Sequence, residues 1–139
     1  MALDLTSLTK AIDALDRSLA ATADGLSAIP PDLRDTVRAG IIQHFEVAYE
    51  LCWKFLQRWL RENASPGEAD FPRTRKDLFR QAARAGVLDD PTPWFGFGDA
   101  RNLTSHTYDG EIALDVCEAA RRFLPQAKEL LARLADRND

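Results

Sequence analysis

The segment over residues 99–109, with the sequence DARNLTSHTYD, holds the densest set of reactive side chains in the protein. Between Arg101 and Tyr108 it places an arginine, an asparagine, a histidine, a tyrosine and three further hydroxyl residues, and Leu103 is its only aliphatic residue. Burying so many hydrogen-bonding groups costs free energy unless they are paired or used. This segment is therefore the first candidate for a functional site.

Arg101 and His106 together suit the cleavage of a phosphodiester bond without a metal ion. A guanidinium can hold a phosphate through two parallel hydrogen bonds, and an imidazole titrates near neutral pH. His106 would take the proton of a ribose 2′-hydroxyl or protonate the leaving oxygen, and Arg101 would stabilise the charge that builds on the phosphoryl group. Residues five apart on an ideal helix lie about 140° apart around its axis. The two side chains therefore converge only if the helix ends near His106 or if Arg101 folds back.

Two other interpretations of these residues stay open at this point. An arginine and a histidine near a helix end are often a cap and a surface ion pair, and a short motif is only a hypothesis. A Ser–His–Asp hydrolase is disfavoured, because Ser105 and His106 are adjacent and point apart and no nucleophile-elbow glycine pattern surrounds the serine.

Helices must position this segment, because apolar residues recur at three- and four-residue steps along most of the chain and the alternation typical of strands is weak. Thr74 is a predicted N-cap with Asp77 in the capping-box position, Gly86 a predicted stop, and Thr92 a predicted cap for the next helix. Besides the short helix after Thr74, the predicted helices cover approximately residues 3–24, 32–63, 94–105 and 110–137. The pattern predicts an all-α bundle of four to five helices.

The long helix over residues 32–63 has an unusually wide apolar arc. Its second apolar stripe, centred about 90° from the first, consists of Ile42, Tyr49, Trp53, Leu56 and Leu60. One stripe is enough to join a bundle, so the second suggests packing against another helix, another subunit or both. The opposite face carries charged residues, among them Glu46 and Glu50, and is interpreted as a solvated surface.

Length and composition indicate one ordinary globular domain over residues 1–139. The chain is 45% hydrophobic and 29% charged, which excludes a collagen-like or wholly disordered protein. With a formal net charge of −4, any contact with nucleic acid must come from a local basic patch. There is no apolar run that could span a bilayer and no cationic leader at the N-terminus, which indicates a cytoplasmic protein that does not contact membranes.

No metal site or cofactor is predicted. Cys52 and Cys117 are too few and too far apart for a disulfide framework or a zinc site, and we expect both to be buried thiols. Glu46 and Glu50 share a helix face and could bind a cation, but no third ligand is in reach by spacing.

Two further groups of residues could contact RNA. The concentrated basic patch, which could track an RNA backbone, dock an acidic partner or simply face water, consists of Arg73, Arg75, Lys76, Arg80 and Arg84. The aromatic residues Trp94, Phe95 and Phe97 could stack on a base, but beside two glycines they are more typical of a core or an interface.

The sequence over residues 100–109 resembles the signature of the HEPN superfamily, in the branch of HepT toxins and nucleotidyltransferase substrate-binding proteins. That signature has an arginine, a polar residue, a histidine five positions after the arginine and a tyrosine two further on. These places are occupied by Arg101, Asn102, His106 and Tyr108. A second block, IQHFEVAYELCWK over residues 42–54, resembles the long-helix signature of the same branch, as does the segment around Trp94. The resemblance covers nearly the whole chain.

The resemblance implies a HEPN-like helical domain that forms a homodimer, with the two motif segments facing each other. It also implies a partner, a minimal nucleotidyltransferase that acts as antitoxin. In toxin–antitoxin members the HEPN protein is a metal-independent RNA endonuclease, silenced when AMP is transferred to the motif tyrosine, here Tyr108. Arg101 would bind the phosphate, His106 would act as general acid or base, and Asn102 would orient the pair. Other members are non-catalytic subunits that present a substrate to the nucleotidyltransferase, and the same motif serves both interpretations.

Overall fold

The computed structural model describes residues 2–63, 72 and 74–138, and within these residues the secondary structure is helical throughout, without strands. The α-helices are α1 (Thr6–Ala20), α2 (Arg34–Asn63), α3 (Arg75–Arg84), α4 (Thr92–Asn102) and α5 (Gly110–Asp136). Short 3-10 helices cover Leu26–Ala28, Pro31–Leu33 and Leu103–His106. The predicted all-α bundle is confirmed. None of the described helices has both the length and the apolar character needed to cross a bilayer.

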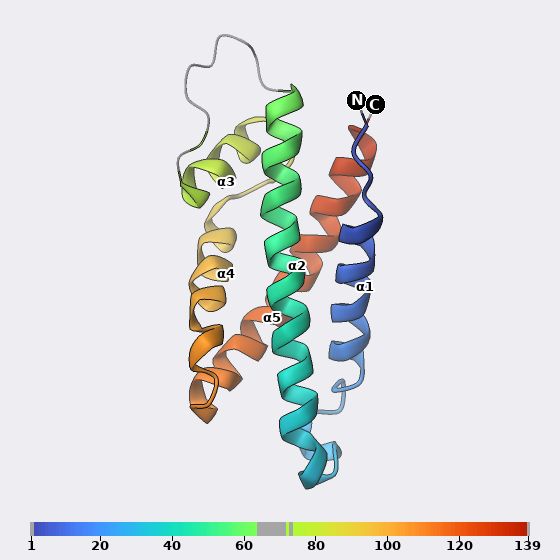
Figure 1. The fold of residues 1–139 in the computed structure, drawn as a ribbon, viewed down its shortest axis with the longest axis vertical. Helices are drawn as coiled ribbons and strands as arrows, with labels where there is room; N and C mark the ends of the chain where they lie inside the picture. Colours follow the sequence, from blue (N-terminus) through green and yellow to red (C-terminus); the bar gives the residue numbers. More distant parts are fainter. Residues whose placement is uncertain (1, 64–71, 73, 139) are drawn as a thin grey trace.

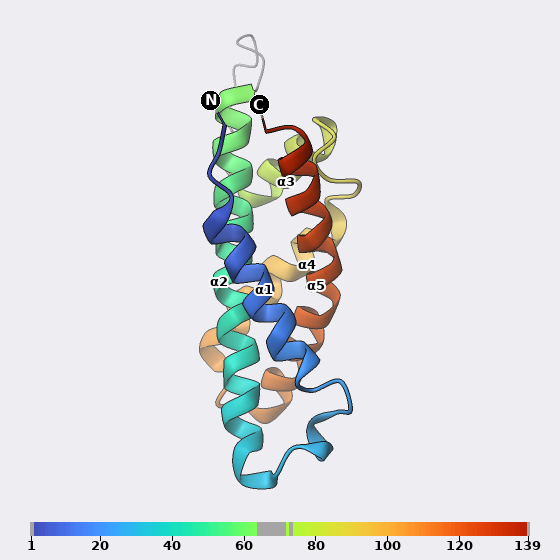
Figure 2. The ribbon, with the colours of Figure 1, turned by 90° about the vertical axis from the view of Figure 1, so that its right-hand side faces the viewer.

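Helix α2 is the central element, and α1, α3, α4 and α5 all contact it (Figure 1). Helix α1 lies on one side of α2 and α4 on the other, while α5 crosses α2 obliquely. Figure 2 shows α1 in front of α2 and α5, and it contacts both helices. The two ends of the chain meet, because the backbone N–H of Leu3 donates to Asn138 Oδ1 at 2.7 Å and Asn138 Nδ2 donates to the Leu3 carbonyl at 2.8 Å.

An aromatic cluster fixes α4 against the rest of the bundle. The ring of Phe123, in the middle of α5, meets Phe45, Trp94 and Phe97 nearly edge-on, at centroid distances of 5.3, 5.6 and 5.3 Å. All four side chains are buried. Edge-to-face pairs of this kind stabilise by about 0.5–1.5 kcal/mol beyond the burial of their area. The interpretation of Trp94 and Phe97 as core residues is confirmed. Their contacts with Phe123 anchor the first half of α4 to α5.

The second apolar stripe of α2 is covered by the chain itself. Its members Ile42, Tyr49, Leu56 and Leu60 are all buried within the subunit, and only Trp53 is half-buried. Tyr49, for instance, contacts Phe79 of α3 at a ring-centroid distance of 6.3 Å. Because α3 and α4 pack on this face, the stripe needs no second subunit and gives no support for a dimer.

Most local signals for the helix ends are confirmed. Thr74 Oγ1 accepts a hydrogen bond from the backbone N–H of Asp77 at 3.1 Å. Gly86, with a φ of +84°, follows the end of α3, and the helix does not continue past it. The predicted cap at Thr92 is wrong, because Thr92 is the first helical residue and its own N–H donates to Asp90 Oδ1 at 2.9 Å. Helix α1 is shorter than predicted, because the chain turns after Ala20.

The two cysteines are buried thiols, as predicted, and burial raises the pKa of both Cys52 and Cys117.

The end of α4 lies within the segment that carries the candidate functional residues. The α-helix stops at Asn102, three residues earlier than predicted, and the chain continues as a 3-10 helix to His106. The tighter winding of a 3-10 helix changes where the side chains of this segment point.

Candidate functional site

Arg101, in the last turn of α4, turns its side chain onto α2. Its Nε donates a hydrogen bond to Glu50 Oε1 at 3.0 Å, and its Nη2 lies 3.5 Å from Glu46 Oε2. The two carboxylates are four residues apart and therefore share one face of α2. All three side chains are 23–30% exposed, so the ion pairs are partly shielded from water. The guanidinium is thus held against the central helix.

Thr104 completes the cradle of Arg101. Its hydroxyl accepts from Arg101 Nη1 at 3.2 Å and donates to the Arg101 carbonyl at 2.8 Å. These contacts close the end of α4 and link the guanidinium to the 3-10 helix that follows. A guanidinium has five N–H groups, one on Nε and two on each Nη. Among the described residues each of these nitrogens has one partner, so one N–H on Nη1 and one on Nη2 remain for a ligand such as a phosphate oxygen.

Glu50 is shared by several groups. Besides Arg101, it accepts a hydrogen bond from Trp53 Nε1 at 2.9 Å, and it lies 3.6 Å from Arg75 Nη2 at the start of α3. The Arg75 guanidinium also lies over the Trp53 ring, 4.7 Å from its centroid. The interpretation of Glu46 and Glu50 as solvated surface charges is wrong. Sequence spacing could not reveal their role, because Glu50 and Arg101 are 51 positions apart.

His106 and Tyr108 lie at the surface, at and just beyond the end of the 3-10 helix. Both side chains are exposed, Tyr108 to 87%, and their rings meet nearly edge-on at a centroid distance of 6.2 Å. Within the described residues no hydrogen bond joins Arg101 to His106, because Arg101 is drawn onto α2. The helix does end near His106, as convergence requires, but one subunit alone does not bring the two groups together.

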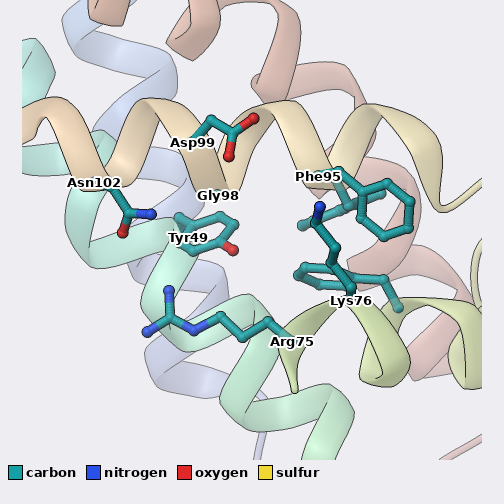
Figure 3. A pocket seen from close by; sticks show the side chains of 9 residues that line it. Tyr49, Arg75, Lys76, Phe95, Gly98, Asp99 and Asn102 are labelled. Atoms are coloured by element: carbon teal, nitrogen blue, oxygen red, sulfur yellow. The ribbon is translucent and has the colours of Figure 1, made fainter.

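Asn102 lies beside a pocket formed by α2, α3 and α4. Tyr49, Arg75, Gly98 and Asp99 also line this pocket (Figure 3). In the described part of the chain Asn102 makes no hydrogen bond to Arg101 or His106, so its predicted role in orienting that pair stays a prediction. Sequence reasoning missed Tyr49 and Gly98 as lining residues of this pocket. Tyr49 belongs to an apolar stripe of the long helix and Gly98 is one of two glycines near Trp94, so neither residue indicated a pocket.

The basic patch lies largely on α3, beside this pocket. Lys76 and Arg80 both lie over the ring of Phe95, at 5.5 and 5.2 Å from its centroid, and Arg80 Nη1 also pairs with Asp77 at 3.0 Å. Arg84 is exposed, and Arg73 lies outside the described residues. Some side chains of the patch, such as Arg75, therefore make local contacts, whereas Arg84 faces solvent.

The fold and the site together define an all-helical protein with a fixed arginine and an exposed histidine on one short segment. The chain matches the family model described as "Nucleotidyltransferase substrate binding protein like" over residues 3–136. It is 36% identical over 138 residues to a Haemophilus influenzae protein named "Probable ribonuclease HepT", covering 98% of this chain and 94% of that protein.

Two solved structures have the same fold. One is a Haemophilus influenzae protein described as revealing the fold of a substrate binding domain of a nucleotidyltransferase. Its TM-score is 0.87 at 34% identity, over 95% of this chain and 99% of that one. The other, a Thermus thermophilus protein, has a TM-score of 0.72 at 28% identity, over 91% of this chain and 98% of that one. The chain belongs to the nucleotidyltransferase substrate-binding protein-like family, in the HepT-like branch that the sequence motif indicated.

Double-mutant cycles test how Arg101 is held. We expect Arg101→Ala and Glu50→Ala to couple by about 1–2 kcal/mol in the free energy of unfolding, because hydrogen bonds between charged, partly buried groups stabilise by this order. The cycle of Arg101 with Glu46 should give about 0.5 kcal/mol, as for a longer ion pair. Urea unfolding measures both.

The control is the surface pair of Arg38 and Asp35, where Asp35 is 91% exposed and we expect almost no coupling. If Glu46 coupled to Arg101 more strongly than Glu50 does, Glu50 would not be the main anchor of the guanidinium.

Proposed function

We propose that this protein is a metal-independent RNA endonuclease, the toxin of a toxin–antitoxin pair. The observation that carries the proposal is the arginine at the end of α4, five residues before an exposed histidine. Glu50 and Thr104 fix this arginine, and two of its N–H groups have no partner in the described part of the chain. This pair of groups supplies an anion holder and a proton-transfer group, which is what phosphodiester cleavage without a metal needs. The relative named a probable ribonuclease supports the same chemistry.

In the proposed reaction Arg101 binds the scissile phosphate through its remaining N–H groups. His106 takes the proton of the ribose 2′-hydroxyl, which then attacks the phosphorus, or protonates the 5′-oxygen that leaves. Glu50 and Glu46 touch neither the substrate nor the reacting atoms in this scheme. They position Arg101, so that the guanidinium does not have to be ordered when the charge develops.

A homodimer would bring the two groups together. Exposed large apolar residues occur within and after the motif, with Leu103 at 39% and Leu114 at 47% exposure, and Val47 on α2 is 41% exposed. A second subunit packed on this side of the chain would cover such side chains. We propose that two copies pair through this face, so that His106 of one subunit lies beside Arg101 of the other.

Tyr108 is the proposed target of AMP transfer by a minimal nucleotidyltransferase partner. It is 87% exposed, and its ring lies 6.2 Å from that of His106. An attached nucleotide would add bulk and negative charge next to the general acid or base, where the RNA phosphate must bind. The family description, which names nucleotidyltransferase substrate binding, supports such a partner.

A second function is supported by the same description. The protein would then be a non-catalytic subunit that holds a substrate for the nucleotidyltransferase. The pocket beside Asn102 favours it, because a binding subunit needs a concave site and a nuclease needs only an exposed cleft. The two functions share a fold and differ in whether His106 does chemistry.

Cleavage of RNA in the presence of EDTA separates the two functions. We expect the purified protein to cut single-stranded RNA, and both His106→Ala and Arg101→Ala to lower the rate by at least about 100-fold, since general acid–base catalysis contributes a factor of this size or more. His44→Gln, which changes the chain's other histidine on α2, is the matched control and should cut at the normal rate. No cleavage by the unaltered protein, or equal cleavage by His106→Ala, would leave the binding subunit as the function.

Mixed dimers test whether the site is shared. Neither Arg101→Ala nor His106→Ala should cut RNA alone, but chains co-expressed and purified together should regain about one quarter of the activity, because half of the pairs are mixed and each mixed pair has one complete site. Light scattering should give twice the chain mass of 15.5 kDa. If the mixture stays inactive although mixed dimers form, arginine and histidine act within one chain.

Mass spectrometry tests the modification. After incubation with the partner nucleotidyltransferase and ATP, we expect an AMP adduct on the unaltered protein and none on Tyr108→Phe. The chain has two tyrosines, and Tyr49 is buried, so Tyr108 is the tyrosine that the partner can reach. An adduct that persists in Tyr108→Phe would show that another residue is modified, and no adduct on either would remove the proposed partner reaction.

A further inference from the structure

The pocket formed by α2, α3 and α4 has a volume of about 120 Å³ and is lined in part by Asn102 of the candidate catalytic segment. Its walls are aromatic, with Trp94 and Phe95 among them, and its mouth carries Arg75 and Lys76. In Figure 3 the Arg75 side chain extends beneath the Tyr49 ring, and Asn102 lies beside that ring. The pocket shares a wall with the phosphate site, because Asn102 follows Arg101 in α4 and Arg75 shares Glu50 with Arg101.

The hydroxyl of Tyr49 is an unsatisfied polar group at this pocket. Tyr49 is 0% exposed, and its Oη has no hydrogen-bond partner in the described part of the chain. Burial raises the pKa of Tyr49, and the Arg75 guanidinium, whose carbon lies over the ring at 5.7 Å from its centroid, opposes this in part without making a hydrogen bond of good geometry to the hydroxyl. A buried hydroxyl without a partner costs stability compared with a phenylalanine in the same place. Such a group calls for an explanation beyond packing.

Gly98 makes room for this hydroxyl. A Cβ at position 98 would lie only 2.9 Å from Tyr49 Oη, closer than real Cβ atoms approach. A glycine inside a helix also costs about 1 kcal/mol relative to alanine. Tyr49 and Gly98 therefore both lower the stability of the fold. If these positions served packing alone, phenylalanine and alanine would be more stable there. Gly96 lies two residues earlier in the same helix and differs from Gly98, because a Cβ at position 96 would meet nothing within 4 Å.

We infer that this pocket binds the base of a pyrimidine nucleotide, next to the phosphate that Arg101 holds. The inference rests on the proposed ribonuclease function and names the part of the RNA that the protein would read. Single-stranded RNA is recognised by splaying out bases, stacking them on aromatic or arginine side chains and reading their edges with hydrogen bonds. Tyr49 Oη and the Asn102 amide supply a donor and an acceptor each for such an edge.

Size and charge favour a single-ring base. A closed cavity of about 150 Å³ binds one benzene ring, and this pocket has a volume of about 120 Å³ and opens to solvent, so it matches a single six-membered ring, whereas the second ring of a purine would have to protrude from it. Asp99 on the rim disfavours a buried anion, which argues against a phosphate inside the pocket. Arg75 and Lys76 at the mouth can hold the sugar–phosphate backbone outside.

Titration of the full-length protein with the four ribonucleoside monophosphates, followed by calorimetry or NMR, tests the inference. We expect CMP or UMP to bind at least about tenfold more tightly than AMP and GMP, as the pocket volume implies. Tyr49→Phe should weaken pyrimidine binding about tenfold, which corresponds to a lost hydrogen bond, while the melting temperature stays the same or rises because the unsatisfied hydroxyl is gone.

Gly98→Ala and Gly96→Ala form the matched pair. The first should weaken binding, because its Cβ forces the Tyr49 hydroxyl to move, and the second should bind normally. Absence of binding by all four nucleotides, stronger purine binding, or unaltered binding by both Tyr49→Phe and Gly98→Ala would overturn the inference even if RNA is cleaved. Pyrimidine binding that depends on Tyr49, without any RNA cleavage, would support the pocket assignment while removing the ribonuclease function.

Discussion

The site depends on one interaction, the ion pair between Arg101 and the acidic face of α2. A guanidinium at the end of a helix would normally extend into water, where it loses nothing by staying mobile. Here Glu50 and Glu46 draw it onto the central helix, and Thr104 ties it to the turn that follows. Thr104 holds both the guanidinium and the Arg101 carbonyl at the point where α4 gives way to a 3-10 helix, and His106 lies exposed at the end of that helix.

Glu50 extends this constraint to a third helix. Its carboxylate accepts hydrogen bonds from Arg101 of α4 and from the Trp53 indole N–H of α2. It also forms an ion pair with Arg75 of α3. The aromatic rings around Phe123 pack α4 and α5 against α2 in the same bundle. Because Glu50 contacts both Arg101 and Arg75, a change at Glu50 would alter both the proposed phosphate site and the pocket beside Asn102. Glu50 thus links the two sites.

The sequence predicts those parts of the structure that depend on local spacing. Periodicity places the helices, and the pair of Thr74 and Asp77 identifies a cap that the structure contains, because both are interactions between residues a few positions apart. The same local reasoning fails at Thr92, where Asp90 makes the capping contact instead. For the site, the motif segment is found from its composition alone, since hydrogen-bonding residues at such density are unusual within a helical bundle.

What sequence reasoning could not predict depends on contacts between distant residues. The partners Glu50 and Arg101 are 51 positions apart, and a charged face on a helix looks the same whether it meets water or an arginine. The second stripe of α2 is another case, because a wide apolar arc fits a second subunit as well as it fits α3 and α4. The match between Tyr49 and Gly98 is a steric detail at one atom, and periodicity carries no information about it.

The carboxylates that hold Arg101 also weaken its attraction for an anion, which bears on the proposed reaction. A fully charged, mobile arginine would bind the phosphodiester of substrate and product strongly, and uniform binding does not accelerate the chemical step. A guanidinium that is partly neutralised by Glu50 and Glu46 but fixed in direction binds the monoanionic phosphodiester weakly. The same carboxylates also repel the second negative charge that would develop on the phosphoryl oxygens, so their contribution to the proposed reaction is order and not charge. Because Glu50, Glu46 and Thr104 fix the guanidinium beforehand, it would not have to be ordered when that charge forms, and this is why an RNA-cutting site would tolerate two carboxylates beside its arginine.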